Sequence, residues 1–386
     1  MEKQNLIFIL VDGARVDRIS RFEDFTSLIN KGTFFSHMIA HAPYTLVQMN
    51  SIFTGMYGGK NGINAYYKMF KHPRDGCKTL AEYLTENGYY TQGDAMRLSL
   101  VSNRGFNKLT QQEDYNTNFA KVHCEILDEI IESKEKNQPF FAYLHYPKIH
   151  HQIQKAVFEK YDDFSEEYFE NKERNLKNYD KYLECAGEYL RIVFNKIHSL
   201  DLDKNSVIVI MADHGMGIGE KKGEMAYGIF TYDYSLRTFA IFIHPTIFSA
   251  NKVNNELTRT IDVMPTILEV LNIEQDPSSL KMQGQSLIPL INNKIPISEE
   301  NDFDRVAFSE TGGLKGPWPS PNEPNVKCVR TKNWKLIHNL TPDTWELYNL
   351  KEDPAEEKNV YDNNPGIVSK LKLKLSEIEE DCNQLS

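Results

Sequence analysis

The stretch NLIFILVDG, residues 5–13, is an uninterrupted apolar run that ends in an acid and a glycine. An apolar run without alternation is typical of a strand that is buried on both faces of a sheet. Three more runs have the same character, at Phe140–Leu144, Val207–Met211 and Phe239–Ile243. We therefore expect these four runs to be strands of one buried sheet.

An amphipathic helix is expected before the third run. Its apolar residues recur at alternating spacings of four and three, which places them on one helical face: Tyr179, Leu183, Ala186, Leu190, Val193 and Ile197. Cys185 lies in the same segment and is interpreted as a core residue. Buried strands that alternate with such helices predict an α/β fold, with a mostly parallel central sheet covered by helices on both faces.

The character of the chain changes near residue 275, where turn residues and charges become frequent. Short segments in 325–350 are expected to pair as antiparallel strands, and 369–382 to form a closing helix. We predict a catalytic α/β domain over residues 1–285 and a smaller subdomain of strands and a helix over residues 286–386.

Composition excludes several classes of protein. The 44 Lys and Arg residues against 54 Asp and Glu give a net charge of −10, which argues against nucleic-acid binding. No apolar run approaches the roughly 20 residues of a transmembrane helix, so a soluble, cytoplasmic protein is expected. The five cysteines lack C-x-x-C spacing, so neither a zinc knuckle nor a disulfide framework is indicated. The oligomeric state is left open.

Two of the expected strands end in acids. Asp12 follows the first run, and Asp213, with His214 beside it, follows VIVIM at 207–211. Such positions face the ligand crevice of an α/β sheet, and a buried carboxylate there requires a cation or hydrogen bonds. Each acid could instead cap a turn or helix. The three together favour one divalent cation, such as zinc, manganese, calcium or magnesium.

Thr45 opens an expected helix within APYTLVQMN, residues 42–50. Its spacing to Gln48 fits a capping box, in which both side chains bind free backbone N–H groups. A hydroxyl at a helix start beside a cation can also act as a nucleophile, because nearby amides stabilise a tetrahedral anion. Both interpretations of Thr45 stay open.

Several segments in order resemble the sulfatase and alkaline phosphatase superfamily over nearly the whole chain. They include NLIFILVDGAR (5–15), APYTLVQMNSIFTGMYGGKNGI (42–63), PFFAYLHYPKIHH (139–151), VIVIMADHGMGIGE (207–220), TIDVMPTILEVLNI (260–273), MQGQSLIPLI (282–291) and WELYNLKEDPAEEKNV (345–360). The resemblance implies that Asp12, Thr45, Asp213 and His214 form the metal site. It also places Thr45 at the position of the covalent nucleophile.

The sequence departs from typical sulfatases at that nucleophile. Those enzymes carry Cys-x-Pro-x-Arg or Ser-x-Pro-x-Arg, whose first residue becomes formylglycine, whereas residues 45–49 here are TLVQM. The Gly-Lys-His that usually follows the Asp-His-Gly is also missing. The remaining set resembles the phosphoethanolamine and phosphoglycerol transferases of the superfamily. Lys148 stands where threonine-dependent phosphodiesterases place an aspartate for a second metal, so one cation is expected.

The main functional prediction is therefore a metal-dependent hydrolase or transferase of phosphate esters that works through a covalent threonine. The substrate would be a small-molecule, glycan or lipid-headgroup ester. One alternative is a sulfatase that acts on sulfate esters without formylglycine. Another is a binding protein that kept the fold and lost catalysis.

Residues around the expected nucleophile supply candidates for the remaining roles. His150 matches the superfamily histidine that contacts the transferred group or leaving oxygen, and could protonate the leaving alkoxide. His151, Lys60, Lys222 and Arg15 are candidates for substrate contacts; a solvated loop or surface charge is the alternative for each. The Gly/Pro-rich segment 310–324 is interpreted either as a wall of the substrate pocket or as a connector.

Overall fold

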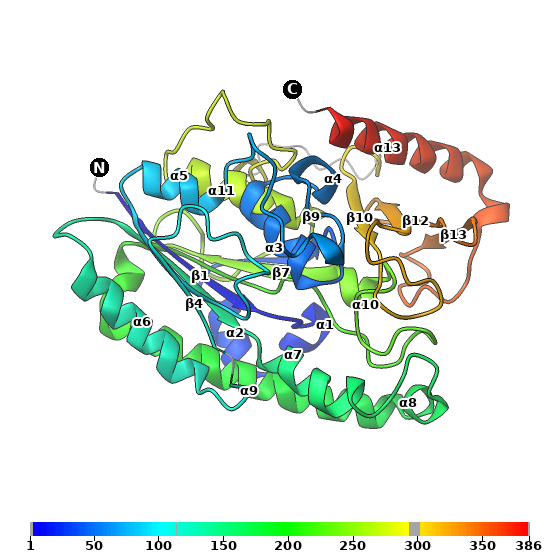
Figure 1. Cartoon of the computed structure of the whole chain (residues 1–386), viewed down its shortest axis with the longest axis horizontal. Coiled ribbons are helices and arrows are strands. Elements are labelled where there is room, and N and C mark those ends of the chain that lie inside the picture. Colours follow the sequence, from blue (N-terminus) through cyan, green and yellow to red (C-terminus); the bar gives the residue numbers. More distant parts are fainter. Residues whose placement is uncertain (1–2, 113, 293–301, 385–386) are drawn as a thin grey trace.

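The computed structural model describes residues 3–112, 114–292 and 302–384, and β1 (Asn5–Val11) lies near the middle of its large sheet (Figure 1). β1 pairs in parallel with β5 (Phe140–Tyr146) on one side and with β6 (Ser206–Met211) on the other. The carboxyl ends of β1 and β6 therefore meet at one edge of the sheet, where Asp12 and Asp213 follow them.

The large sheet has nine strands among the described residues, and most neighbouring pairs are parallel. β7 (Arg237–Ile243) is the exception, because it is antiparallel to both β6 and β2. The order is β4 (Lys108–Gln111), β3 (Tyr90–Ala95), β5, β1, β6, β7, β2 (Thr33–Ile39) and β8 (Lys252–Asn254), with β9 (Thr258–Arg259) also pairing with β2. The prediction of a mostly parallel central sheet is confirmed.

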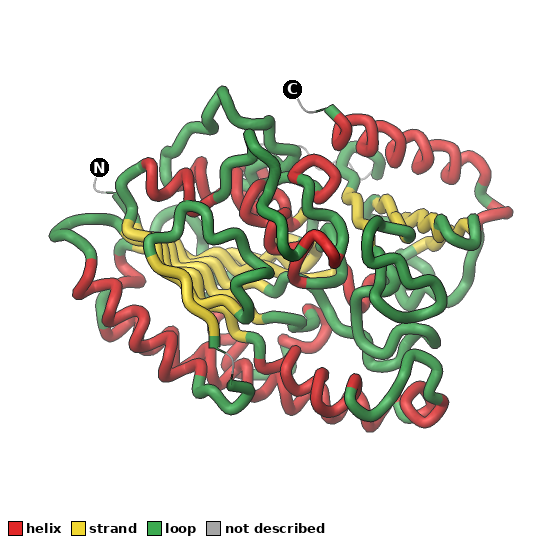
Figure 2. Tube along the Cα trace, in the orientation of Figure 1, coloured by secondary structure: helices red, strands yellow, loops and turns green. Residues whose placement is uncertain are grey.

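Alternate side chains of β1 enter two separate cores, which explains why its sequence is apolar throughout. Leu6, Phe8 and Leu10 belong to the core beneath α3 (Thr45–Thr54), α5 (Leu80–Glu86) and α11 (Val263–Val270). Ile7, Ile9 and Val11 belong to the core beneath α6 (Phe119–Ser133) and α9 (Lys172–Ser199). Figure 2 shows the strands as a layer between these two sets of helices.

α9 contains the predicted amphipathic segment, and its expected apolar face is buried. The interpretation of Cys185 as a core residue is wrong, because its thiol is exposed. Leu183 and Ala186 lie on the buried face, whereas position 185 points away from it. The shorter helices are α1 (Val16–Ile19), α2 (Glu23–Ile29), α4 (Gly58–Asn61), α7 (Lys148–Ile153), α8 (Glu166–Glu170), α10 (Asp233–Leu236) and α12 (Ile288–Ile291).

The C-terminal part forms a second, antiparallel sheet covered by a closing helix (Figure 1). Its strands are β10 (Ala307–Thr311), β11 (Val326–Arg330), β12 (Trp334–Asn339) and β13 (Thr344–Asn349), and the helix is α13 (Pro365–Asn383). The expected strands and helix of this region are thus confirmed.

The predicted boundary between residues 285 and 286 stays a prediction. α12 lies after it, yet Leu290 and Ile291 pack in the core of the large sheet. Part of the turn-rich segment that suggested the boundary, residues 293–301, lies outside the described residues. Over the described ranges, no helix combines the length and apolar character that a membrane crossing requires.

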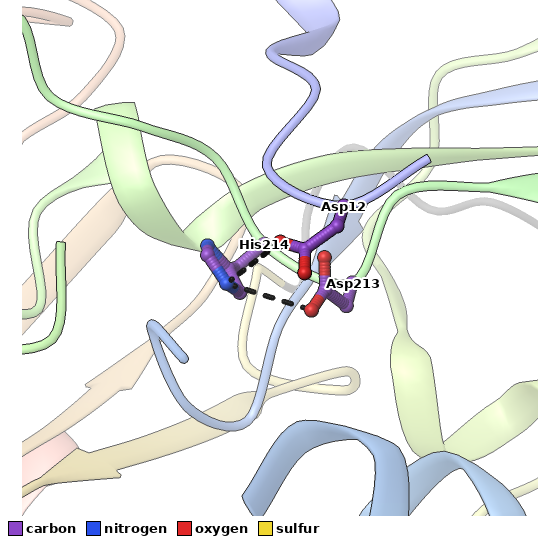
Figure 3. A group of neighbouring side chains, drawn as sticks. All are labelled: Asp12, Asp213 and His214. Atoms are coloured by element: carbon purple, nitrogen blue, oxygen red, sulfur yellow. Dashed lines mark ion pairs between the residues drawn. The ribbon is translucent and has the colours of Figure 1, made fainter. Parts of the chain in front are cut away.

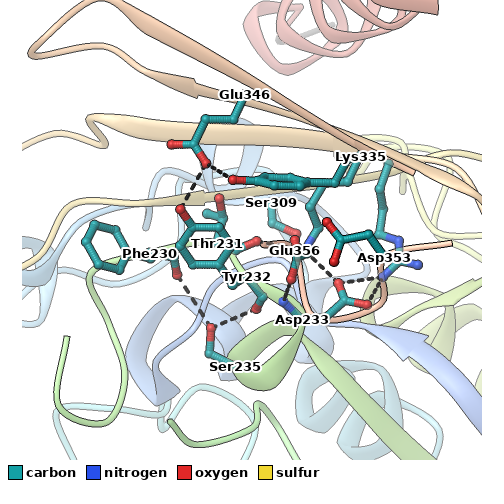
Figure 4. Close-up of polar contacts among 12 residues, drawn as sticks. Phe230, Thr231, Tyr232, Asp233, Ser235, Ser309, Lys335, Glu346, Asp353 and Glu356 are labelled. Atoms are coloured by element: carbon teal, nitrogen blue, oxygen red, sulfur yellow. Dashed lines mark hydrogen bonds and ion pairs between the residues drawn. The ribbon is translucent and has the colours of Figure 1, made fainter. Parts of the chain in front are cut away.

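A buried ion cluster joins the second sheet to the large domain (Figure 4). The Lys335 ammonium, fully buried on β12, donates to Asp233 at 2.6 Å, to Glu356 at 2.8 Å and to the carbonyl of Thr231 at 2.9 Å. Arg330 pairs with the same Asp233 at 2.7 Å. Because Asp233 opens α10 on the segment between β6 and β7, these charges fix the second sheet against that segment.

Replacing Lys335 by methionine tests this junction. The variant leaves Asp233 and Glu356 buried with fewer cations, and breaking one partner of a buried ion pair typically costs about 3–5 kcal/mol. We expect a clear fall in the urea midpoint of unfolding. Lys332→Met is the matched control, because Lys332 is 44% exposed and pairs with Glu256 at 3.0 Å; such a surface pair contributes below about 1 kcal/mol. Equal midpoints for the two variants would refute the role of the cluster.

Candidate active site

Three buried side chains converge where β1 and β6 end. Asp12, Asp213 and His214 each offer a ligand atom, and these atoms all lie within 4.8 Å of one another (Figure 3). All three side chains are completely buried. The strand register explains the meeting, since Leu10 of β1 lies opposite Met211 of β6 and both chains leave the sheet in the same direction.

Hydrogen bonds leave the inward-facing atoms of this group free. His214 Nδ1 lies 2.7 Å from the carbonyl oxygen of Gly215, which can only accept, so Nδ1 carries the proton. The lone pair of Nε2 then faces Asp213 Oδ2 at 3.5 Å and Asp12 Oδ1 at 3.7 Å. Neither of those oxygens has a hydrogen-bond partner among the described residues. Three unshared lone pairs in one place fit a divalent cation.

The electrostatics of the two acids support the same interpretation. Burial opposes ionisation of Asp12, but the hydrogen bond from His145 holds the pKa of its carboxyl well below the usual range. Burial, and then the negative charge of Asp12, raise the pKa of the Asp213 carboxyl. Two carboxylates this close do not both ionise easily without a cation between them.

Thr45 lies at the first turn of α3 with its hydroxyl directed at this group. Its Oγ1 donates to Asp12 Oδ2 at 3.3 Å and lies 3.5 Å from His214 Nε2. The capping-box interpretation is wrong, because Thr45 makes no cap and Gln48 accepts instead from the backbone N–H of Ala42 at 3.1 Å. The hydroxyl is thus held by the acid cluster rather than by its own helix.

His145 orients Asp12, a role that the sequence analysis did not assign. The backbone N–H of Met96 lies 3.2 Å from His145 Nδ1 and can only donate, so Nδ1 is the acceptor and Nε2 carries the proton. Nε2 then donates to Asp12 Oδ2 at 3.1 Å. Oδ2 accepts from both His145 and Thr45, which leaves Oδ1 for a cation. The only sequence signal was a histidine inside a buried strand.

A cavity of about 380 Å³ opens onto the site, and both Thr45 and His150 line it. The Tyr227 hydroxyl lies 2.8 Å from His150 Nδ1 and 3.2 Å from Nε2. Burial raises the pKa of Tyr227, so its phenol stays a donor, and burial lowers the pKa of His150. The cluster of acids lies behind Thr45, away from solvent.

The cavity includes two cations that the sequence analysis did not single out. Arg97 follows β3 and Lys315 belongs to the Gly/Pro-rich segment 310–324; both are exposed and line the cavity. Leu314 of the same segment lines it too, so this segment forms part of the cavity wall. Arg97 has no ion pair with any described residue, and neither has Lys315.

The structure places the other candidate residues away from the cavity. Arg15 pairs with Asp17 at 2.9 Å and with Glu220, and Lys60 pairs with Asp381 of α13 at 3.3 Å. Lys222 is 57% exposed and pairs with Glu166 at 3.6 Å. The ring of His151 packs against Tyr115 with centroids 4.5 Å apart. None of the four is among the residues that line the cavity.

Glu224 shapes the wall beside Tyr227. Its carboxylate accepts from the backbone N–H groups of Ile229 at 2.6 Å and Phe230 at 2.8 Å, and from the hydroxyl of Tyr234. Burial raises the pKa of Glu224 to about 7. This acid therefore organises the segment that carries Tyr227, Gly228 and Ile229 to the cavity.

Comparisons with known proteins agree in one family. A model of the Sulfatase family matches residues 4–273, and one described as N-sulphoglucosamine sulphohydrolase, C-terminal, matches residues 226–381. The N-acetylglucosamine-6-O-sulfatase of Bacteroides thetaiotaomicron is 27% identical over 196 residues, covering 48% of this chain and 32% of that protein. Arylsulfatase J of Mus musculus is 20% identical over 298 residues, which cover 68% of this chain and 48% of that protein. The matches thus span a third to a half of these relatives.

Solved structures show the same fold over nearly the whole chain. A 2-O GAG sulfatase superposes with a TM-score of 0.80 at 19% identity, covering 99% of this chain and 93% of that one. A protein in complex with D-glucosamine-2-N,6-O-disulfate gives 0.73 at 18% identity, covering 98% of each chain. The phosphonate monoester hydrolase of Agrobacterium radiobacter superposes with a TM-score of 0.71 at 14% identity, covering 98% of this chain and 96% of that one. At these identities the likeness concerns the fold alone.

The main functional prediction, a hydrolase or transferase of phosphate esters, is wrong. The matching family model and the curated relatives named above are sulfatases, so the sulfate-ester alternative fits better. The prediction rested on the loss of Cys-x-Pro-x-Arg at residues 45–49. That motif determines how the nucleophile is made, and its absence does not specify phosphorus over sulfur as the atom attacked. With a family model matching residues 4–273, the chain belongs to the sulfatase family.

Proposed function

We propose that the protein hydrolyses sulfate monoesters with the unmodified hydroxyl of Thr45 as nucleophile. The observation that carries the proposal is the position of Thr45, which lines a cavity and has its Oγ1 3.3 Å from Asp12 Oδ2, in a chain of the sulfatase family. The names of the relatives support sulfate esters as substrates, including esters of sugars. Because the matches span only part of those relatives, the activity of this chain remains our proposal.

Asp12, Asp213 and His214 would hold one divalent cation through the three free lone pairs. When bound, the cation supplies positive charge beside the nucleophile and the sulfate oxygens. Zinc, manganese, calcium and magnesium are all compatible with two carboxylates and an imidazole. The fit rests on Asp12 Oδ1 and Asp213 Oδ2, two buried oxygens without partners among the described residues.

The residues around Thr45 suit a two-step reaction. The oxygen of Thr45 forms a bond to sulfur as its proton passes to Asp12 Oδ2, and the ester S–O bond breaks. His150 donates a proton to the departing alcohol oxygen. Water then attacks the sulfur of the sulfothreonine, giving its proton to His150, and the bond from sulfur to Thr45 breaks as Asp12 returns the proton. The products are the alcohol and hydrogensulfate.

Isosteric replacement of Thr45 tests the nucleophile. Thr45→Val removes the hydroxyl and keeps the shape, so we expect hydrolysis of 4-nitrophenyl sulfate to fall at least about a thousandfold, whereas Thr45→Ser should keep measurable turnover. The parent protein should hydrolyse 4-nitrophenyl sulfate faster than 4-nitrophenyl phosphate. A Thr45→Val variant with the parent rate would remove Thr45 from the mechanism. If the parent turns over no sulfate ester, the proposed function fails.

His145 should affect cation binding without touching the cation. His145→Leu removes the N–H that holds Asp12 Oδ2, and loss of such an orienting partner typically lowers metal affinity about 10–100-fold. The amide of His145→Gln can donate to Asp12, so this variant should regain part of the lost metal affinity. Isothermal titration with Mn²⁺ measures the affinity. His123→Leu is the control, because His123 is equally buried and hydrogen-bonds Asp94 at 3.3 Å, outside the site. Unchanged Mn²⁺ affinity in His145→Leu would contradict this role.

The role of His150 predicts a dependence on both the leaving group and pH. Burial lowers the pKa of His150 below its ordinary value of 6.5, so its protonated form becomes more abundant as the pH falls from 7 towards 5. We expect kcat/KM for an alkyl sulfate to rise over that range. In His150→Gln, kcat/KM for the alkyl sulfate should no longer rise as the pH falls. Its value should also be about 10²-fold lower than that of the parent protein. Hydrolysis of 4-nitrophenyl sulfate, whose alcohol leaves without a proton, should change much less; equal losses would refute acid catalysis.

A further inference from the structure

The cavity above Thr45 is lined mainly by apolar and aromatic side chains. Its volume of about 380 Å³ lies near the lower end for small-molecule sites, enough for one ring and its sulfate group. The apolar and aromatic side chains of the lining include Tyr66, Met69, Met96, Leu100, Phe158 and Leu314. Leu314 is 49% exposed, so part of this apolar surface faces the open cavity.

Few polar groups in the lining are free to receive hydroxyl groups. Each carboxylate oxygen of Asp163 already accepts one backbone N–H, from Gly316 at 2.9 Å and from Met225 at 3.4 Å, which leaves one lone pair on each. Tyr44 donates to the carbonyl of Asn64, and Tyr227 contacts His150. Gln154 and the hydroxyl of Tyr66 remain as uncharged polar groups of the lining. A sugar ring buried here would lose water from several hydroxyls without gaining matching partners.

The charges of the lining match the sulfate group rather than the alcohol. Arg97 and Lys315 are the cations of the lining, and neither forms an ion pair with a described residue. The long side chain of Lys315 keeps its ammonium at the exposed rim, 6.0 Å from the centroid of the Phe158 ring. One sulfate monoester carries a single negative charge, which either cation can pair with while the ring packs against the apolar wall.

We propose that the site selects sulfate monoesters of a compact apolar alcohol, with one aryl or alicyclic ring, over esters of polyhydroxylated sugars. The inference rests on the proposed function, because it concerns the alcohol part of the same ester. It separates this chain from relatives whose names specify sulfated sugars. The apolar wall receives the ring, and Arg97 and Lys315 supply positive charge in the same cavity for the sulfate group.

The test compares two esters that differ mainly in the polarity of one ring. Cyclohexylmethyl sulfate and glucose 6-sulfate are both primary alkyl sulfates on a six-membered ring with one charge. Each is used as a competitor of 4-nitrophenyl sulfate hydrolysis by the full chain. We expect the inhibition constant of cyclohexylmethyl sulfate to be at least about tenfold lower. An equal or better inhibition by glucose 6-sulfate would overturn the inference while leaving the proposed function intact.

A pair of leucine variants links the selectivity to the wall. Leu314→Ser should raise the inhibition constant of cyclohexylmethyl sulfate about fivefold and change that of glucose 6-sulfate less than twofold. Leu340→Ser is the control, because Leu340 is 39% exposed at the turn between β12 and β13, outside the cavity lining. Equal changes for both esters in Leu314→Ser would overturn the assignment of the wall. Absence of any sulfate-ester hydrolysis would overturn the proposed function, and this inference with it.

Discussion

Two like charges meet in the interior of this protein, and the rest of the site is arranged around them. Asp12 and Asp213 are both fully buried, at the ends of adjacent parallel strands, with one oxygen each lacking a partner among the described residues. Two carboxylates in such a place are stable only if one binds a proton or a cation lies between them. The tautomer of His214, fixed by the Gly215 carbonyl, adds a lone pair where a third donor would complete a cation site. The strand ends thus bring together two carboxylates that require a proton or a cation between them, before any substrate is considered.

Much of the fold could be predicted from the sequence because burial leaves a direct signature. β1 is apolar at every position since its alternate side chains enter different cores, Leu6 and Phe8 on one face and Ile7 and Ile9 on the other. The same logic indicated which strands carry acids at their ends. The apolar pattern could not predict which acid an individual Lys or Arg would pair with. Arg15 and Lys60 are buried against acids distant in sequence, Glu220 and Asp381, and nothing local to either residue specifies that pairing.

The site was predictable only to the extent that strand ends place its residues. Asp12, Asp213 and His214 follow from that rule, and Thr45 came from its helix start and the family resemblance. His145 did not follow, because its role depends on contacts across the sheet, and Arg97 did not follow, because only the folded chain shows that it lines the cavity. His145 accepts from the backbone of Met96 on one side and donates to Asp12 on the other. The choice between phosphate and sulfate was mispredicted for a related reason: a missing modification motif says how a nucleophile forms, whereas the atom attacked depends on the whole site.

The segment between β6 and β7 gives the second sheet a means to influence the site. It begins with Asp213 and His214 and continues through Glu224 to Tyr227, which lines the cavity. It ends near Asp233, in the buried ion cluster with Lys335. One end of this segment therefore carries two candidate cation ligands, and the other is held by β12. The cavity wall lies between two fixed points, so the position of Tyr227, and through it that of His150, depends on both sheets. The second sheet therefore helps to position the residues of the cavity, although none of its strands reaches the acid cluster.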